Sequence, residues 1–270
     1  ENPVNVKWGK QMLAIERKNQ ILTILQDEKK VVVAELSAKF GVSEETIRRD
    51  LEKLEKEGYV VKAYGGAVLN ENAQKDLPSM VRRKTNIVGK QRIAELISAR
   101  IKDGDSIMLD ASSTALYIAQ KIKDKKNITL ITNSVEILYE TSDMAGWKIF
   151  STGGIMAEGA MALIGTYANS MVERLHVAKT IVSCKGLEKR RGITDSSEVH
   201  SSTKRAMLAA AEKKILAVDH LKFDRSAFDR VCGFENIDVI VTDRRPSSEW
   251  MKVFEKYGIE CHYPEEEQNG

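Results

Sequence analysis

The sequence has few cysteines, few prolines and no long apolar run. Only 3 of its 270 residues are cysteine and 4 are proline. Cys184, Cys232 and Cys261 are widely spaced and form no Cys-x-x-Cys pair, so we expect buried structural cysteines rather than a disulfide framework or a zinc site. No run of 18 apolar residues and no secretory signal is present. These absences exclude a membrane-spanning protein and favour a cytoplasmic one.

Histidine is also scarce, and it is scattered. His176, His200, His220 and His262 stand without a serine–acid triad or metal-ligand spacing around them. The sequence therefore predicts no catalytic residue, no metal and no cofactor.

What is present is the composition of a globular protein. Hydrophobic residues make up 42% of the chain and charged residues 30%, and the mean hydropathy is −0.32. A chain of this length is expected to form about two domains. The net charge of +3 is too small to identify a partner.

The stretch 43–54 has the pattern of a DNA-reading helix. Ser43 can cap the free backbone N–H groups at its start, and two glutamates follow in the first turn, where the helix dipole favours negative charge. Ile47, Leu51 and Leu54 recur at helical spacing and form one apolar stripe. A short helix with one buried stripe, paired arginines and small polar residues near its start suits the major groove of DNA.

The flanking residues complete a winged helix. Leu36 and Phe40 lie on the apolar side of a preceding helix, and Gly41 permits a tight turn into the next one. Residues 57–69 read as two short strands around Gly65-Gly66, a pair that favours a hairpin turn.

Together these residues resemble the DNA-binding domain of the DeoR family of bacterial transcriptional regulators. The resemblance rests on Arg17, Ile21, Leu25, the specific run Ser-x-x-Thr-Ile-Arg-Arg-Asp-Leu at 43–51, and Tyr-Gly-Gly-Ala at 64–67. It implies double-stranded operator DNA as a partner. The expected DNA-binding residues are Ser43, Glu45, Thr46, Arg48, Arg49, Lys53, Lys62 and Tyr64.

The charge of this domain sets a condition on DNA binding. Between Met12 and Asn70 there are ten Lys/Arg and ten Asp/Glu residues, so the large basic footprint of many DNA-binding proteins is absent. The alternative for Arg48 and Arg49 is a solvated helix face with i,i+4 ion pairs. DNA binding therefore predicts a dimer or tetramer, which multiplies the contacts.

The domain organisation follows from changes in pattern. We expect the winged helix over 12–69, a polar linker over 70–78, and an effector-sensing and oligomerisation domain over 79–264. Residues 79–102 read as one helix. Residues 1–11 have no period, and are an upstream extension or a non-native remnant.

In the second domain, short apolar runs alternate with amphipathic segments. Strands are expected at 106–110, 128–132, 148–152, 180–184, 215–219 and 239–242, with helices between them. This alternation predicts an α/β fold with a mostly parallel sheet.

Small polar residues and glycine follow four of these strands. Ligands of open parallel sheets collect at the carboxyl ends of the strands, where helix N-termini attract anions. Ser112, Ser113 and Thr114 could surround a phosphate, with Lys185 and Lys204 as charge partners. The alternative is that Ser-Ser-Thr and Thr-Asn-Ser are only helix caps.

This second domain also resembles the effector domain of DeoR regulators, which is similar to ribose-5-phosphate isomerase and generally senses phosphorylated sugars. Residues 219–223 match the family's Asp-x-Ser-Lys-Phe pattern except for Leu221 in place of serine. The effector-binding residues that the resemblance implies are Asp110, Ser112, Ser113, Thr114, Thr132, Asn133, Ser134, Gly153, Gly154, Lys185, Gly186 and Lys204.

The loop expected over 190–198 is a candidate cover for a bound sugar, with Asp195 or Glu198 accepting hydrogen bonds from its hydroxyls. The sequence thus predicts a repressor of a sugar-metabolism operon that is controlled by a phosphorylated sugar. The alternative is a sugar-phosphate isomerase with an ancillary DNA-binding domain, using Lys185 with Asp195 or Glu198. A chromosome-architecture protein is a third interpretation, and it leaves the polar strand ends unexplained.

Overall fold

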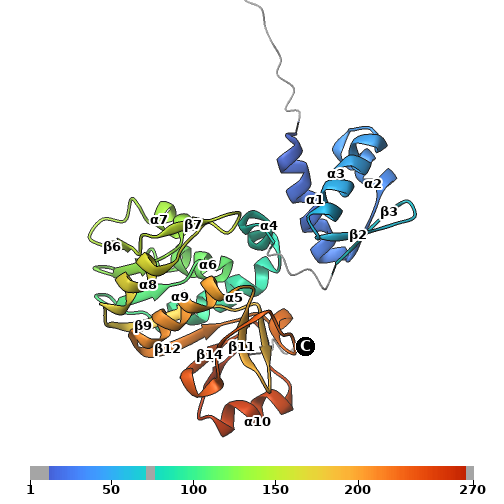
Figure 1. Ribbon diagram of the computed structural model, residues 1–270. Helices are drawn as coiled ribbons and strands as arrows, with labels where there is room; N and C mark the ends of the chain where they lie inside the picture. Colours follow the sequence, from blue (N-terminus) through green and yellow to red (C-terminus); the bar gives the residue numbers. More distant parts are fainter. Residues whose placement is uncertain (1–11, 71–76, 266–270) are drawn as a thin grey trace, which may run out of the picture. The chain divides into compact units, whose positions relative to one another are not determined.

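The computed structural model describes residues 12–70 and 77–265, and the chain divides into two compact units (Figure 1). The first unit ends at Thr85 and the second begins at Asn86. The expected upstream extension, 1–11, and linker residues 71–76 lie outside the described residues.

The first unit is a winged helix. Its elements are α1 (Ala14–Glu28), β1 (Lys30–Val32), α2 (Val33–Phe40), α3 (Glu44–Lys56), β2 (Val60–Ala63), β3 (Gly66–Leu69) and α4 (Ser79–Lys84). The strands form an antiparallel sheet in the order β1-β3-β2. Ile47, Leu51 and Leu54 of α3 are buried with Ile21 and Leu25 of α1, as the apolar stripes predict.

Local chemistry sets the turns of this unit. Gly41 ends α2 with a φ of 64°, and the Ser43 hydroxyl accepts a hydrogen bond from the Thr46 N–H at 3.2 Å to start α3. Gly65 makes the hairpin turn at a φ of 76°. At Gly66 a Cβ atom would lie 2.0 Å from the Val31 carbonyl oxygen, so only glycine lets β3 pair this closely with β1.

The single helix expected over 79–102 is wrong: two helices, α4 and α5 (Ile87–Ser98), occupy this stretch. Asn86 separates them in a left-handed conformation, with a φ of 46°, and its side chain caps α5 by accepting from the Gly89 N–H at 3.3 Å. Val81 of α4 is fully buried in the core of the first unit. Helix α4 therefore belongs to the winged helix, not to the second domain.

The second unit is a parallel α/β sheet with smaller antiparallel additions. Beyond α5, its elements are β4 (Ser106–Leu109), α6 (Ser113–Lys121), β5 (Thr129–Thr132), α7 (Val135–Glu140), β6 (Lys148–Ser151), β7 (Ile155–Ala157), β8 (Ala162–Ile164), α8 (Thr166–Glu173), β9 (Val177–Val182), β10 (Gly186–Glu188), β11 (Gly192–Asp195), α9 (Glu198–Ala209), β12 (Ala211–Ala217), η1 (His220–Lys222), β13 (Asp229–Cys232), η2 (Phe234–Asn236), β14 (Val239–Val241), α10 (Ser248–Lys256) and β15 (Glu260–His262).

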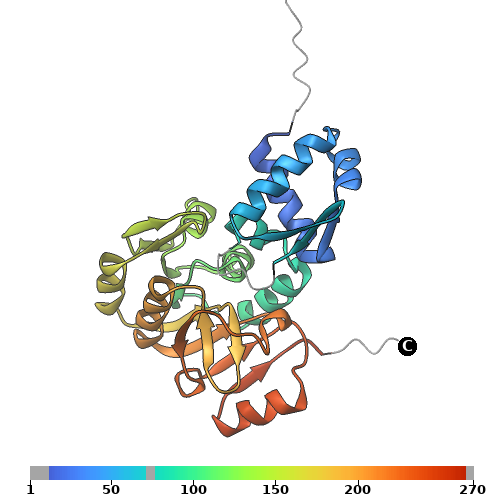
Figure 2. The same ribbon diagram turned by 45° about the vertical axis from the view of Figure 1, so that its right-hand side comes forward.

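The main sheet has seven strands in the order β15-β14-β12-β9-β4-β5-β6, and every pairing is parallel. Successive side chains of a strand point to opposite faces. Ile107 and Leu109 accordingly pack in the core that contains helices α5 and α6, whereas Met108 packs in the core that contains α9 and α10. Helices thus cover both faces of the sheet, as the alternation of elements predicts (Figure 2).

The loop expected over 190–198 is also wrong. Gly192–Asp195 forms strand β11, which is buried along its whole length between β10 and β13. Gly192 has a φ of 80°, and a Cβ there would lie 2.5 Å from the Cys232 carbonyl oxygen. Strand β11 pairs with β13, which lies far along the chain. The four residues of β11 alone therefore give no sequence signal for a strand.

The cysteine prediction is confirmed for Cys184, which is buried and free, while Cys232 and Cys261 are free but half-buried. Burial raises the pKa of the Cys184 thiol to about 12. Among the described residues, no three His, Cys, Asp or Glu side chains are grouped to hold a metal ion. Every helix in the described ranges is too short or too polar to cross a bilayer.

Candidate functional site

The outward side of helix α3 carries the two arginines predicted to contact DNA. Arg48 and Arg49 are both exposed and pair one turn back, with Glu44 at 2.5 Å and Glu45 at 3.3 Å. The i,i+4 pairs considered as the alternative to DNA contact are therefore present. Exposed pairs of this kind contribute only about 0.2–1 kcal/mol each, so a phosphate or a base edge can replace either glutamate.

Asp50, the acid of the Arg-Arg-Asp run, faces inward. Its carboxylate accepts from the Arg17 Nε at 2.5 Å, and both side chains are almost completely buried. This pair fixes α3 against α1 and so sets the direction of the exposed arginines. The sequence reasoning missed this role, although Asp50 lies three residues after Ile47 and directly before Leu51, on the apolar side of the helix.

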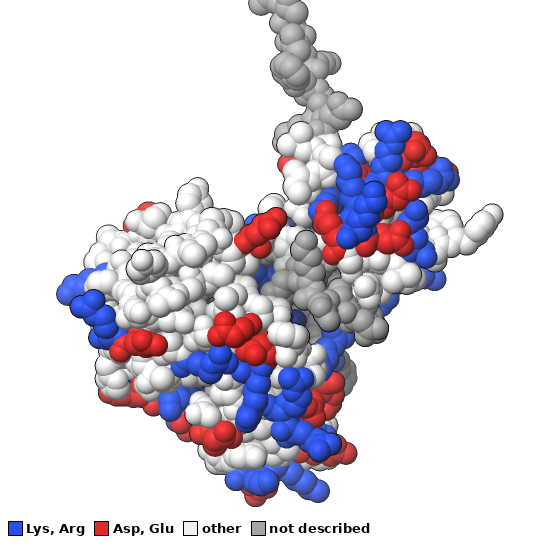
Figure 3. Space-filling model, in the orientation of Figure 1, with Lys and Arg blue, Asp and Glu red and all other residues white. Residues whose placement is uncertain are grey.

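The wing adds a separate set of groups. Tyr64 is fully exposed at the hairpin turn, and the Lys62 ammonium pairs with Glu52 of α3 at 3.2 Å. Lys53 is exposed, while Ser43 and Thr46 hydrogen-bond each other through their hydroxyls at 2.9 Å. On the visible face of this unit, basic and acidic side chains are interspersed, as the neutral count predicts (Figure 3).

The second candidate site lies at one edge of the parallel sheet. Strands β9, β4, β5 and β6 are neighbours and parallel, so their carboxyl ends, where the predicted effector residues follow, lie along the same edge. Asp110 is buried there and links two of these ends. Its Oδ1 accepts from the Ser112 N–H at 3.2 Å and its Oδ2 accepts from the Ser183 N–H at 3.0 Å.

Lys204 of helix α9 is held entirely by protein groups. Its Nζ donates to the Ser183 carbonyl oxygen at 2.6 Å and to the Asp195 carboxylate at 2.5 Å, and it lies 3.1 Å from Asp110. We call Lys204, Asp110 and Asp195 the buried ion cluster. The Lys204 ammonium is thus surrounded by two carboxylates and a carbonyl, and its role as the charge partner of a ligand stays a prediction.

The charges of this cluster are stabilised by one another. Burial alone would raise the pKa of the Asp195 carboxyl, but Lys204 and Lys185 outweigh it and hold this pKa well below its ordinary value. Burial alone would lower the pKa of Lys204, and Asp195 and Asp110 instead raise it above its ordinary value. Asp195 and Lys204 are therefore both charged at neutral pH.

Several of the predicted effector residues serve the local fold. Ser112 caps α6 by accepting from the Ala115 N–H at 3.1 Å, and Ser134 caps α7 by accepting from the Ile137 N–H at 3.2 Å. The Thr132 hydroxyl donates to the Leu109 carbonyl oxygen at 2.7 Å and accepts from the Ser134 N–H. The capping alternative therefore describes what Ser112 and Ser134 do in this structure.

Three polar side chains at the carboxyl ends of the strands can form further hydrogen bonds. Ser113 and Thr114 stand in the first turn of α6, and within the described ranges their hydroxyls have no hydrogen-bond partner. The Asn133 amide donates to the Leu163 carbonyl oxygen at 3.0 Å, but its own oxygen is buried without a partner among the described residues. Buried polar atoms are rarely left unsatisfied, so the Asn133 oxygen is a candidate ligand contact, and the two hydroxyls at the start of α6 are available to the same ligand.

The predicted glycines differ in what they do. Gly153 has a φ of 64° and open space around it, so it can line a site. At Gly154 a Cβ would lie 2.6 Å from the Ile164 carbonyl oxygen, and at Gly186 it would lie 2.3 Å from that of Arg225. These two glycines are required by packing. Lys185 donates its backbone N–H to Thr194 at 3.0 Å, and its charge acts on Asp195.

Both acids of the isomerase alternative are already paired with other side chains. Asp195 is engaged by Lys204, whereas Glu198 begins α9 at the surface and pairs with Arg205 at 3.6 Å. Residues 219–223 lie at the carboxyl end of β12. There the Asp219 carboxylate accepts from the Leu221 N–H at 3.0 Å, and the His220 ring pairs with Asp243 at 2.7 Å.

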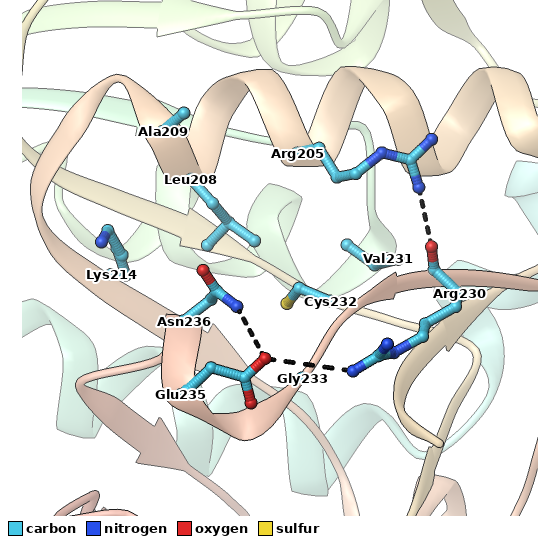
Figure 4. A pocket seen from close by; sticks show the side chains of 10 residues that line it. All are labelled: Arg205, Leu208, Ala209, Lys214, Arg230, Val231, Cys232, Gly233, Glu235 and Asn236. Atoms are coloured by element: carbon cyan, nitrogen blue, oxygen red, sulfur yellow. Dashed lines mark hydrogen bonds and ion pairs between the residues drawn. The ribbon is translucent and has the colours of Figure 1, made fainter.

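A hollow of about 440 Å³ lies away from the predicted effector edge (Figure 4). It is bounded by the end of α9, by β13 and by η2, which precedes β14 and so stands at the amino end of that strand. Arg205 donates to the Arg230 carbonyl oxygen at 2.7 Å, and Arg230 faces Glu235 at 3.9 Å. The sequence analysis did not anticipate this hollow.

Both units match models of one family. Residues 17–73 match the DeoR-like helix-turn-helix domain and residues 85–244 match the DeoR C terminal sensor domain. The chain belongs to the DeoR family of transcriptional regulators. This membership confirms the resemblance seen in the sequence, and it places the chain among regulators rather than enzymes.

Curated relatives span most of the chain. The HTH-type transcriptional regulator YulB of Bacillus subtilis is 37% identical over 86% of this chain and 90% of its own length. The transcriptional repressor AccR of Agrobacterium fabrum is 34% identical over 84% of this chain and 89% of its own length. The L-fucose operon activator of Haemophilus influenzae is 32% identical over 90% of this chain and 97% of its own length. Among solved structures, ribose 5-phosphate isomerase A of Methanocaldococcus jannaschii aligns over 52% of this chain and 55% of its own at 14% identity, with a TM-score of 0.38.

Proposed function

We propose that this regulator is a repressor of a sugar-metabolism operon that reads operator DNA with α3 and its wing, and that a phosphorylated sugar at the carboxyl ends of β9, β4, β5 and β6 controls its DNA affinity. It acts in the bacterial cytoplasm as a homo-oligomer. The residues proposed to contact DNA are Ser43, Glu45, Thr46, Arg48, Arg49, Lys53, Lys62 and Tyr64.

The DNA side of the proposal is supported by exposure. Arg48 and Arg49 point outward from a helix that is capped by Ser43 and fixed by the buried Arg17–Asp50 pair. A helix held in this way can present its first turns to the major groove. Because the unit is formally neutral, the glutamates that pair with the arginines have to yield to DNA when it binds.

The observation that carries the effector side is the buried Asn133 oxygen, which has no partner among the described residues, together with the first turn of α6 at the same end of the sheet. The first turn of α6 offers backbone N–H groups, the dipole end and the Ser113 and Thr114 hydroxyls, a combination that suits a phosphate. The free oxygen of Asn133 suits a sugar hydroxyl. The L-fucose operon activator, a relative named for a sugar operon, points to the same class of ligand.

Control of DNA binding follows from differential affinity. A ligand that binds one arrangement of the oligomer more tightly shifts the population towards it, and a shift away from the DNA-competent arrangement releases the operator. We propose release as the sign of the effect. Tightening of operator binding as the ligand is added would contradict that sign.

A thermal-shift screen tests the effector claim. The full chain is heated with phosphorylated sugars and with their unphosphorylated parents. A ligand at ~100 times its dissociation constant adds about 2.7 kcal/mol of stability. One phosphorylated sugar is expected to raise the melting temperature while its parent does not.

Two matched variants locate the site. Ser113→Ala, at the first residue of α6, is expected to abolish the shift, whereas Ser248→Ala, at the equivalent position of α10, is expected to retain it. Equal shifts in both variants would place the ligand elsewhere. No shift with any sugar phosphate would remove the sugar-phosphate claim and leave the DNA-binding claim standing.

A further inference from the structure

The sensor unit has an uncharged surface around the last strand of its sheet. Between Lys148 and Glu173 the only charged residue is Glu158, whereas 30% of the whole chain is charged. This segment forms β6, the β7–β8 hairpin and most of α8. In Figure 3 the part of the sensor unit that carries α7, β7 and α8 in Figure 1 shows a broad area without basic or acidic side chains.

Four large apolar side chains are exposed on β6, β7 and α8, and a fifth, Tyr139, is exposed on α7. Their exposed fractions are 84% for Tyr139, 45% for Phe150, 69% for Ile155, 53% for Met156 and 80% for Tyr167. If whole side chains of this kind present ~150–250 Å², the five expose roughly 650 Å². Contiguous apolar patches on soluble monomers rarely exceed a few hundred Å², and one partner in a standard interface buries about 800 Å². These side chains therefore supply a large part of the area of a stable dimer, with Ile155 and Met156, as neighbours in β7, on opposite faces of the hairpin.

Strand β6 adds hydrogen-bonding groups to the same surface. It ends the seven-stranded sheet, and β5 is its one neighbour within the described part of the chain. Proteins usually protect such an edge with charges, prolines or covering segments. Of its four residues only Lys148 is charged and none is proline, so the edge is poorly guarded against pairing.

We propose that a second copy of this chain docks on this surface, which we call the β6–α8 face and define by Tyr139, Phe150, Ile155, Met156 and Tyr167. A two-fold interface brings the same patch of both copies together, and an uncharged patch can do so without opposing like charges. A different protein partner would gain steering and specificity from charge, which this face lacks. The location of the interface stands on its own, while its role in bringing two α3 helices to one operator rests on the proposed function.

The solution mass of the full chain tests the interface. Sedimentation equilibrium at micromolar concentrations is compared for the wild type, for Ile155→Glu/Tyr167→Glu, and for the control Phe228→Glu, an exposed aromatic outside the face. Two charges buried in the interface are expected to raise the dissociation constant about 100-fold or more, and the control is expected to leave it unchanged. Because all three positions are exposed, thermal unfolding of the isolated protomer is expected to stay the same.

The possible results of this experiment either support or overturn the proposed interface. A wild-type dimer, or a tetramer that the double variant reduces to smaller species, supports the proposal. A wild-type monomer at every concentration, or a double variant with the wild-type mass, overturns it. An oligomer that dissociates as expected but binds no DNA would leave this interface in place and refute only the proposed function.

Discussion

The two units use ion pairs in opposite ways. On α3 both side chains of the pairs Arg48–Glu44 and Arg49–Glu45 are exposed, whereas the sensor unit surrounds Lys204 with the almost completely buried carboxylates of Asp110 and Asp195. Exposed pairs contribute little and are exchangeable, while a buried charge that loses its partner costs several kcal/mol. The exposed charges of the first unit can therefore exchange their partners for DNA, whereas the buried charges of the sensor unit hold distant parts of its chain together.

The segments joined by the buried ion cluster are distant in sequence. Asp110 follows β4, Asp195 ends β11, and Lys204 lies on α9. The cluster thus connects the main sheet to the smaller β10-β11-β13 sheet at the edge where the effector is proposed to bind. Within the first unit, the buried Arg17–Asp50 pair has the same joining role and links α1 to α3.

The largest expected effect comes from Lys204→Met. This change leaves two buried carboxylates without a partner, so the sensor unit is expected to lose about 5 kcal/mol of unfolding free energy in denaturant titrations. Lys179→Met is the matched control, because it removes a lysine paired at 2.6 Å with Asp105 in a more accessible place. Similar losses in the two variants would show that burial does not distinguish the cluster.

The same variant is expected to reverse the pH dependence of stability. In the wild type the pKa of Asp195 is held below its ordinary value, so its contribution is present at neutral pH and is lost only as the pH falls through the folded-state pKa. Without Lys204, burial is opposed mainly by Lys185, so the pKa of the Asp195 carboxyl rises, the folded state binds more protons, and stability falls as the pH rises. Melting temperatures between about pH 2 and 8 measure both slopes, and parallel slopes would refute the account of the cluster.

Asp50→Asn is expected to have a smaller effect on the first unit. This change leaves the Arg17 guanidinium without its carboxylate partner. The first unit is expected to lose about 3 kcal/mol of unfolding free energy, the lower end of the range for buried pairs, because the long arginine side chain can move its charged group towards water. Hydrogen exchange of α1 and α3 amides reports the loss. If the amides of α9 lost as much protection, the two units would not be independent.

The smallest stability effects are expected on α3, where DNA affinity changes instead. Arg49→Ala is expected to alter unfolding by less than about 0.5 kcal/mol and to weaken DNA binding by about 1–3 kcal/mol. Glu44→Gln is expected to leave stability equally unaffected but to strengthen binding, because Arg48 loses its competing partner. Fluorescence anisotropy with a duplex selected from random sequence by the wild type measures both, and weaker binding by Glu44→Gln would contradict the competition between Glu44 and DNA.

The sequence predicted the parts that depend on local pattern. The apolar stripe of α3, the Ser43 cap, the glycine turns and the alternating strands and helices all follow from neighbours a few residues apart. The break at Asn86 was missed because α4 and α5 continue one helical pattern across it, and the extended Thr85 and left-handed Asn86 interrupt them. Strand β11 was missed because one of its two partners, β13, comes from a distant part of the chain.

For the candidate sites, the sequence predicted the types of residue but not their hydrogen-bond partners. Residue types at the strand ends indicated a polar edge, but they could not show that Ser112 and Ser134 cap helices, or that Lys204 is already bound by two carboxylates. Ser113, Thr114 and Asn133 stand out only when every hydrogen bond at the edge is assigned. Asp50 could have been noticed, because an acid on the apolar side of a helix needs a buried partner.

The central claim is that a ligand at the sheet edge controls α3, and one titration tests it most directly. Operator affinity of the wild type and of Ser113→Ala is measured with the selected duplex, with and without the sugar phosphate that raises the melting temperature of the wild type. The account predicts at least a tenfold weakening by the ligand in the wild type, about 1.4 kcal/mol of coupling, and none in Ser113→Ala. Unchanged affinity in the wild type at saturating ligand would contradict it.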